Sequence, residues 1–268
     1  MDDRRALVEI CRYDDGKPTM KTDVVARESS LTIMVNGERL VSLACLNDMM
    51  MELAWGFMFS EGIVLHRDEI LDATYDRNDI AVSFRLQDAG ERVRAFHDSG
   101  EKTSGCGSGL SAALVARTAD FQSLSVTPAA LTTLTTEFQR QSELFRETGG
   151  VHAAALTDER GFHLSPKTDG NTLRRFAEDI GRHNAVDKVL GADLLEEHHP
   201  AGQILLSSGR ISSEIVKKAV RLQIALIASP SAPTSEAVRL GWEYGVYLCG
   251  FVRGKRLNVY TGFDRLFS

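Results

Sequence analysis

The chain has 268 residues, of which 43% are hydrophobic and 25% are charged, a composition typical of a globular protein. Its formal net charge of −6 disfavours sequence-independent nucleic-acid binding, although a local basic pocket for an anion stays compatible with that sum. No run of about 18 apolar residues occurs and the first residues lack the apolar core of a signal peptide. No membrane span is therefore predicted, and a cytoplasmic protein with reduced cysteines is expected.

The first 125 residues predict a small β-rich module. Residues 1–30 are polar and mixed in charge, and we expect a frayed lead-in there. Asn36-Gly37 stands between two apolar runs and is the strongest short signal for a β-hairpin. The sequence therefore predicts two paired strands at residues 31–35 and 40–45.

One largely buried helix is expected to pack in this module. Its apolar residues lie within residues 49–60, after Asn47 and Asp48, which are both suited to cap the first turn. Residues 80–86 alternate between apolar and polar side chains, as in a half-exposed strand. We expect residues 93–96 to pair with that strand.

A polar, glycine-rich loop at residues 98–109 contains one cysteine, Cys106, with a glycine on each side. Residues 110–118 have a helical pattern, so the loop is expected to end at a helix start, where a thiolate is favoured. We therefore interpret Cys106 as a reactive thiol. It would suit acyl transfer, redox chemistry or sulfur carriage, and the residue pattern does not choose among these. Cys45 and Cys249 lie in apolar runs and are expected to be core residues.

Residues 126–268 predict a second domain in which strands and helices alternate. Thr127-Pro128 is a typical helix start, and that helix is expected to stop at Gly149-Gly150. Strands are then predicted at residues 151–156, 203–207, 224–228, 246–251 and 257–260, with helices at 173–195, 212–222 and 234–244. This alternation indicates a βαβ-built, mostly parallel sheet, so the fold class is α/β, or α+β for the whole chain.

Two loops of this domain leave predicted strands and enter predicted helices. Residues 207–212 and 229–235 are both rich in small hydroxyl residues. Because ligands bind beyond the carboxyl ends of parallel strands, we expect the two loops to line one polar cleft. Free N–H groups at a helix start attract anions, and Arg210 adds a planar donor fork suited to phosphate or carboxylate.

A second polar cluster lies within a predicted helix. His183 and Asp187 are four residues apart, as are Asn184 and Lys188, so two polar faces are expected. Gly181 is unusual inside a solvated helix and indicates close approach to another backbone or to a ligand.

Several familiar site types are excluded by the residue pattern. The chain has no C-x-x-C pair and no zinc-deaminase signature, and the adjacent His198-His199 is a poor pair of ligands for one ion. The phosphate-loop and G-x-G-x-x-G patterns are missing as well. His152 is a lone histidine at a strand start, which we interpret as structural.

Taken together, the motifs resemble one family, the formate dehydrogenase accessory proteins of the FdhD/NarQ type. The matching segments run in family order and comprise residues 35–38, 56–62, 149–154, 178–188, 208–214, 229–235 and 250–256. The resemblance implies a sulfurtransferase that takes persulfide sulfur from a cysteine desulfurase on a loop cysteine. It implies that the sulfur passes to the molybdenum of the bis(molybdopterin guanine dinucleotide) cofactor required by formate dehydrogenase.

The resemblance also implies a fold and an assembly. The C-terminal region resembles the three-layer α/β/α cytidine-deaminase-like fold without its zinc, and family members are dimers, so a homodimer is expected. One departure concerns the loop, which in the family often reads C-G-x-C-G. Here Cys106 matches the first cysteine, and Gly109 takes the place of the second. A persulfide relay needs only one thiol.

The resemblance assigns the catalytic role to Cys106 and implies no bound metal and no permanently bound cofactor. The expected cofactor-binding residues are Ser208, Gly209, Arg210, Ser212, His183, Asn184, Phe251, Val252, Arg253, Gly254, Lys255 and Arg256. Asp187 and Lys188 are further candidates for orienting the guanine or pterin parts, and a free guanine nucleotide is expected to mimic the cofactor. The main alternative is a chaperone that binds the cofactor or a guanine nucleotide without moving sulfur. A zinc-free nucleotide hydrolase is disfavoured because no base–nucleophile pair is evident.

Overall fold

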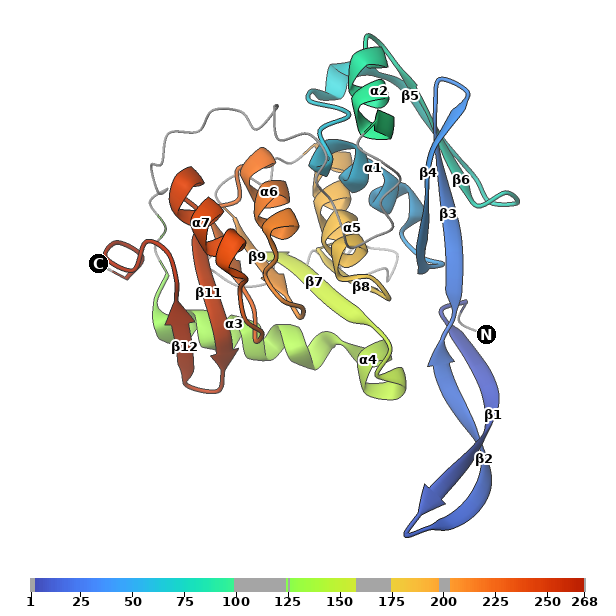
Figure 1. The fold of residues 1–268 in the computed structure, drawn as a ribbon, viewed down its shortest axis with the longest axis vertical. Helices are drawn as coiled ribbons and strands as arrows, with labels where there is room; N and C mark the ends of the chain where they lie inside the picture. The colour runs from blue at the N-terminus through green and yellow to red at the C-terminus, as the bar shows by residue number, and fades with distance from the viewer. Residues whose placement is uncertain (1–2, 99–123, 125, 158–174, 198–202, 268) are drawn as a thin grey trace.

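Within the residues that it describes, the computed structural model has three sheets (Figure 1). The residues that it describes are 3–98, 124, 126–157, 175–197 and 203–267. The predicted loop with Cys106 and the helix predicted at 110–118 lie outside these residues. A two-stranded hairpin lies at one end of the molecule, next to a four-stranded sheet, and a six-stranded sheet forms the larger body (Figure 1).

The expected frayed lead-in is instead a β-hairpin, in which β1 (Arg5–Asp14) pairs antiparallel with β2 (Lys17–Ala26). Asp15 and Gly16 connect the strands with φ angles of 50° and 78°, the conformation of a tight hairpin turn. Most side chains of both strands are exposed. The polar composition therefore reflects a hairpin that buries little surface, and the Asp15-Gly16 pair was the local signal for it.

The four-stranded sheet contains the predicted hairpin around Asn36-Gly37. Its strands are β3 (Glu28–Val35), β4 (Glu38–Leu46), β5 (Ile70–Asp76) and β6 (Ala81–Leu86), in the order β4-β3-β6-β5. The strand expected at 93–96 is wrong, because this segment belongs to helix α2 (Gly90–Asp98). Val93 and Phe96 lie one helical turn apart, and the rings of Phe96 and Phe57 meet edge to face with 5.8 Å between their centroids.

Helix α1 (Met50–Ser60) confirms the predicted buried helix, but neither expected residue caps it. Met49 is the N-cap residue, with a left-handed backbone (φ 51°) and no side-chain capping bond. The Asp48 carboxylate instead lies 2.5 Å from the Lys188 amine. An ion pair with a buried lysine therefore takes the place of the cap.

The helix predicted from Pro128 to Gly149 is interrupted at Ser142, which divides it into two helices. Helix α3 (Pro128–Gln141) begins as predicted, because the Thr127 hydroxyl accepts a hydrogen bond from the Ala130 N–H at 3.1 Å. Ser142 then leaves the helical conformation (φ −70°, ψ 80°), and a short helix α4 (Glu143–Thr148) follows.

The six-stranded sheet follows the predicted alternation with two differences. Its strands are β7 (His152–Thr157), β8 (Phe176–Asp179), β9 (Ile204–Ser207), β10 (Leu226–Ala228), β11 (Tyr247–Arg253) and β12 (Arg256–Val259), in the order β12-β11-β10-β9-β7-β8. Only the β9–β10 and β10–β11 pairings are parallel, and the other three pairings are antiparallel, so the sheet is mixed rather than mostly parallel. The segment expected to start a helix at 173 contains β8 and a turn before helix α5 (Arg182–Leu195).

Helices cover both faces of this sheet, which gives three α/β/α layers (Figure 1). On one face lie α5, α6 (Ser213–Arg221) and α7 (Ser235–Tyr244), and on the other lies α3. Successive residues of β9 alternate between the layers, with Leu205 in the core of the first and Leu206 in the core of the second. The more specific likeness to the cytidine-deaminase fold stays a prediction.

One hydrophobic core continues across the predicted boundary at residue 125. Its buried side chains come from the four-stranded sheet, from α1 and from the α5–α6–α7 face of the larger sheet. Helices α1 and α5 approach so closely that a Cβ atom on Gly56 would lie 1.8 Å from the Asp187 carbonyl oxygen. The division into domains of residues 1–125 and 126–268 stays a prediction, and the core joins its two parts.

Candidate functional site

The two predicted polar loops lie side by side at the carboxyl ends of β9 and β10. The Ser229 hydroxyl in the second loop donates a hydrogen bond of 2.7 Å to the Gly209 carbonyl in the first. Ile211 exchanges two backbone hydrogen bonds with the second loop, at 3.1 and 3.0 Å. The two loops are therefore in direct contact, and the polar cleft that we expect them to line, with a ligand bound in it, stays a prediction. We call the strand ends, these loops and the helix starts that follow them the polar edge.

His152 also lies at the polar edge, because β7 runs antiparallel to β9 and starts where β9 ends. The Ser208 hydroxyl accepts a hydrogen bond from the Ala153 N–H at 2.9 Å and lies 3.2 Å from His152 Nδ1. Burial, helped by the Arg182 charge, lowers the pKa of His152. This position of His152 was not predictable from the sequence pattern, since the direction of β7 depends on pairing with a distant strand.

Arg182, the first residue of α5, is a second neighbour of the first loop that the sequence analysis did not select. A Cβ atom on Gly209 would lie 3.0 Å from Arg182 Cδ and 3.6 Å from His152 Cε1, so only glycine allows this packing without a shift. The Nε atom of Arg182 is buried and has no hydrogen-bond partner in the described part of the chain. Its place next to His183 in the predicted cluster was the available signal.

His183 follows in the first turn of α5 and is 8% exposed. Its Nε2 atom lies 3.4 Å from the hydroxyl of Ser212, the residue that precedes α6. Burial, together with the charges of Lys218 and Arg182, lowers the pKa of His183 to about 4. The ring is therefore neutral at pH 7 and can accept one hydrogen bond while donating another.

Asn184 points away from the loops, into the interior. It is 2% exposed, and its amide donates to the Ala44 carbonyl at 2.7 Å and to Asp179 Oδ1 at 2.9 Å. Gly181 precedes the helix as its N-cap residue, so the inference of a glycine inside a helix is wrong. The cofactor-binding role of Asn184 stays a prediction.

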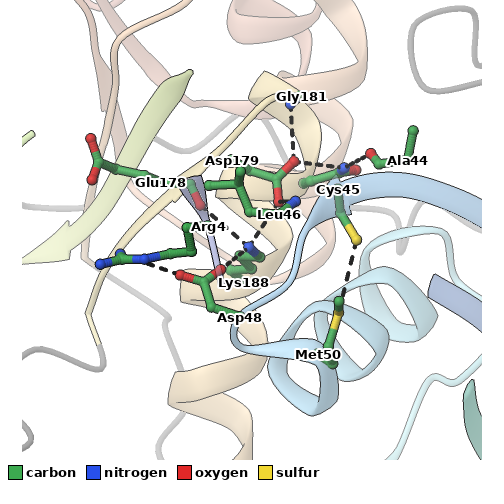
Figure 2. Close-up of polar contacts among 11 residues, drawn as sticks. Arg4, Ala44, Cys45, Leu46, Asp48, Met50, Glu178, Asp179, Gly181 and Lys188 are labelled. Carbon is green, nitrogen blue, oxygen red and sulfur yellow. Dashed lines mark hydrogen bonds and ion pairs between the residues drawn. The ribbon is translucent and has the colours of Figure 1, made fainter. Parts of the chain in front are cut away.

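The two polar faces expected on α5 are absent, because residues 183–194 are all buried. Asp187 lies 2.9 Å from the Lys218 amine and accepts a hydrogen bond of 2.7 Å from the Ser60 hydroxyl. Lys188 pairs with Asp179 at 2.8 Å and with Asp48 (Figure 2). The predicted ligand-orienting residues Asp187 and Lys188 therefore have their side chains in internal ion pairs.

The segment of expected cofactor-binding residues at 251–256 divides between two places. Phe251 and Val252 donate backbone hydrogen bonds of 2.9 and 3.0 Å to the second loop, and Arg253 Nε donates to the Pro230 carbonyl at 2.8 Å. Phe251 has a left-handed backbone (φ 51°), which turns the end of β11 toward that loop. This part of the segment lies at the polar edge.

The rest of the segment is exposed, with Gly254 and Lys255 in the turn between β11 and β12 and Arg256 as the first residue of β12. Gly254 and Lys255 line a hollow of about 660 Å³ together with α3. Arg210 is exposed in the first loop.

The polar edge has the chemistry of an anion site. Three arginines lie on it, namely Arg182, Arg210 and Arg253, and helices α5, α6 and α7 all begin there. Helix starts present unpaired N–H groups and positive dipole ends, and guanidinium groups bind phosphate oxygens in pairs. Among the described residues no group of three or more His, Cys, Asp or Glu side chains could hold a metal ion. In the same residues, no helix is long and apolar enough to cross a membrane.

Comparison with known proteins decides the family. The model of the FdhD/NarQ family matches residues 26–267. The chain belongs to the FdhD/NarQ family. Over 96% of its length it is 35% identical to the sulfur carrier protein FdhD of Bacillus pumilus, of which the match covers 95%. It is also 35% identical to the protein of the same name from Staphylococcus aureus, with 96% of this chain and 94% of that one covered.

The fold is that of a solved structure as well. A crystal structure from Desulfotalea psychrophila, described as a formate dehydrogenase accessory protein, has a TM-score of 0.76 and 23% identity, covering 98% of this chain and 99% of that one. The FdhD/NarQ model begins at residue 26, so almost all of the β1–β2 hairpin precedes the matched region.

The described cysteines of this FdhD/NarQ protein include two core residues, as predicted. Cys45 and Cys249 are fully buried, and burial raises the pKa of each thiol to about 12, with the Asp179 charge contributing at Cys45. Neither is a thiolate at neutral pH. Cys11 is exposed on β1. Cys106 lies outside the described residues.

Proposed function

We propose that this chain is a cytoplasmic sulfur carrier that serves formate dehydrogenase. In this proposal Cys106 accepts persulfide sulfur from a cysteine desulfurase, and the sulfur passes to the molybdenum of bis(molybdopterin guanine dinucleotide), which is a substrate rather than a resident cofactor. The observation that carries the proposal is the identity of 35% over 96% of the chain with proteins named sulfur carrier protein FdhD. The homodimer expected from the family is part of the same proposal.

The polar edge supports the binding part of the proposal. A guanine dinucleotide carries phosphate charges, and three arginines lie close to helix starts. Arg182 begins α5, Arg210 lies in the loop before α6, and Arg253 donates to Pro230 in the loop before α7. The neutral His183 ring and the Ser212 hydroxyl are hydrogen-bonding groups that suit a nucleobase or a pterin edge.

The first sulfur transfer is a thiol–persulfide exchange. The Cys106 thiolate attacks the terminal sulfur of the desulfurase persulfide and forms a new S–S bond. The S–S bond of the donor breaks, and the donor cysteine leaves as a thiolate. No outside oxidant or reductant is needed, and a single thiol is sufficient on the acceptor.

Mass spectrometry of the protein after incubation with a cysteine desulfurase and free cysteine tests the carrier role. We expect one additional sulfur atom on the peptide that contains Cys106, and none in Cys106→Ser. Cys11→Ser is the matched control, because Cys11 is the exposed thiol among the described residues and should not be needed. Sulfur on Cys11 instead, or on neither cysteine, would contradict the proposal.

The second candidate is a chaperone that shelters the cofactor without moving sulfur. It is favoured by Gly109, which occupies the place of the family's second loop cysteine. A cell that lacks its own accessory protein distinguishes the two. Active formate dehydrogenase with Cys106→Ser supports the chaperone, and loss of activity supports the sulfur carrier.

A further inference from the structure

Asp179, at the end of β8, is a fully buried carboxylate that binds four donors from three parts of the chain. Its Oδ1 atom accepts from the Gly181 N–H at 3.0 Å and from the Asn184 amide at 2.9 Å. Its Oδ2 atom accepts from the Leu46 N–H at 3.1 Å and lies 2.8 Å from the Lys188 amine. Figure 2 shows the carboxylate at the centre of these contacts.

Lys188 extends this cluster to the start of α1. Its amine lies 2.5 Å from Asp48 and donates to the Glu178 carbonyl at 3.3 Å. Burial opposes the charged form, but Asp179 and Asp48 outweigh it and raise the pKa of Lys188. The buried Lys188 therefore links the end of β8 to the segment between β4 and α1.

These contacts fix the segment that carries two side chains of the polar edge. Gly181 and Asn184 flank Arg182 and His183, and both are held by the same carboxylate oxygen. Asn184 is held a second time by the Ala44 carbonyl of β4. Because the residues on either side are fixed, Arg182 and His183 can face the first loop in only one register.

We propose that Asp179 is a positioning residue of the anion site, which sets Arg182 and His183 against the first loop from inside the molecule. The inference rests on the proposed function, in which the polar edge binds the guanine dinucleotide. It assigns a binding role to a residue that a ligand would never touch. It also makes β4 and α1 part of the support of that site.

Asp193 is a matched control for a purely structural role. It lies on the same helix and is 1% exposed, and it pairs with Arg175 at 3.2 Å and accepts from Gln203 at 3.0 Å. It lies three turns of helix away from Arg182, at the other end of α5. Asp193→Asn should therefore lower stability without moving the helix start.

The experiment compares D179N, D193N and the double variant D179N/K188M with the unmodified chain. The readouts are thermal stability, the ring resonances of His183 in histidine-labelled protein and the affinity for guanosine diphosphate by calorimetry. We expect D179N to shift the His183 resonances and to weaken nucleotide binding at least tenfold. D193N should leave the His183 resonances unshifted and the nucleotide affinity within twofold of the unmodified chain, despite a similar loss of stability.

The double variant separates an effect on thermal stability from an effect on the position of Arg182 and His183. Removing both members of the buried pair should restore part of the thermal stability, while the His183 resonances and the nucleotide affinity stay altered. It also carries the comparison if D179N alone fails to fold. Unshifted His183 resonances in folded D179N, or affinity that recovers together with stability, would overturn the positioning role.

Failure of the proposed function has a different signature. An unmodified chain that binds no guanosine diphosphate, or that loads no sulfur on Cys106, contradicts the proposed function. The His183 resonances of D179N need no ligand, so they decide the positioning role in either case.

Discussion

The protonation of His183 is set by groups from three helices. The charged groups that act on its ring are Arg182 of α5, Lys218 and Glu214 of α6, and Glu61 at the end of α1. Burial and the two cations outweigh the two carboxylates and lower the pKa of His183 to about 4. Protonation of His183 would therefore place a third positive charge beside Arg182 and Lys218.

This pKa predicts a loss of stability in acid. In the unfolded chain the ring titrates at its ordinary pKa of 6.5, whereas in the folded chain it stays neutral down to about pH 4. Between these values the unfolded state binds more protons, so the free energy of unfolding falls as the pH is lowered, by about 3 kcal/mol in total. Chemical denaturation of the protein and of His183→Gln between pH 7 and pH 4 measures it.

The measure is the difference in pH dependence between the free energies of unfolding of the protein and of His183→Gln, because other groups titrate in the same range. Burial raises the pKa of Asp187 to about 6, and this acid contributes a change of the opposite sign in both proteins. We expect the stability of His183→Gln to depend less steeply on pH. Identical slopes for the two proteins would refute the neutral, buried histidine.

At the scale of elements, the contact between α1 and α5 has almost no space between the two backbones. A Cβ atom on Gly56 would lie 1.8 Å from the Asp187 carbonyl oxygen, and one on Gly191 would lie 1.8 Å from the Glu52 carbonyl oxygen. The clashing atoms belong to backbone, so no side-chain rotation relieves them. The two glycines let α1 pack so closely on α5 that Asp48 and Ser60 reach side chains of α5 and α6.

Gly56→Ala and Gly191→Ala are each expected to lower the free energy of unfolding by about 3 kcal/mol, because overpacking forces the helices apart. Urea denaturation followed by circular dichroism measures the loss. Gly90→Ala is the control, since its Cβ atom would approach only the flexible Arg94 side chain, at 3.9 Å. A loss below about 1 kcal/mol at both helix positions would show that the contact relaxes easily.

At the scale of the whole molecule, the two predicted domains share one core. Buried apolar side chains continue from Leu31 and Ile33 of the four-stranded sheet, through α1, to Val186 and Leu190 of α5. The buried Lys188 has one of its two carboxylate partners, Asp48, on the N-terminal side of the predicted boundary. Separation of the chain at residue 125 would expose the apolar side chains of the shared core. It would also leave the Lys188 ammonium with only one of its two carboxylate partners.

We therefore expect the chain to unfold in one cooperative transition. A fragment of residues 126–268 should be poorly folded on its own, with weak near-ultraviolet circular dichroism and binding of a hydrophobic dye. Mixing it with a fragment of residues 1–125 should recover part of the signal. A sharp, independent melting transition of the C-terminal fragment would contradict the shared core.

Much of the local structure was predictable because its signals act over a few residues. The turn at Asn36-Gly37, the Thr127 cap and the two hydroxyl-rich loops depend on backbone conformations and hydrogen bonds within a short stretch. Strand and helix alternation in the C-terminal half follows from apolar periodicity in the same way. At residues 1–30 the polar composition is misleading, because the hairpin buries little surface and its local signal is the Asp15-Gly16 turn.

The sequence by itself determined these local elements and, through its motifs, the family. Only the tertiary structure decided which residues gather at the polar edge. His152 reaches it because β7 pairs antiparallel with β9, and Arg182 and His183 are held there by Asp179, which also binds Leu46 133 residues earlier in the chain. Such pairings depend on the packing of distant segments around a shared core, and a pattern read over neighbouring residues carries no record of them.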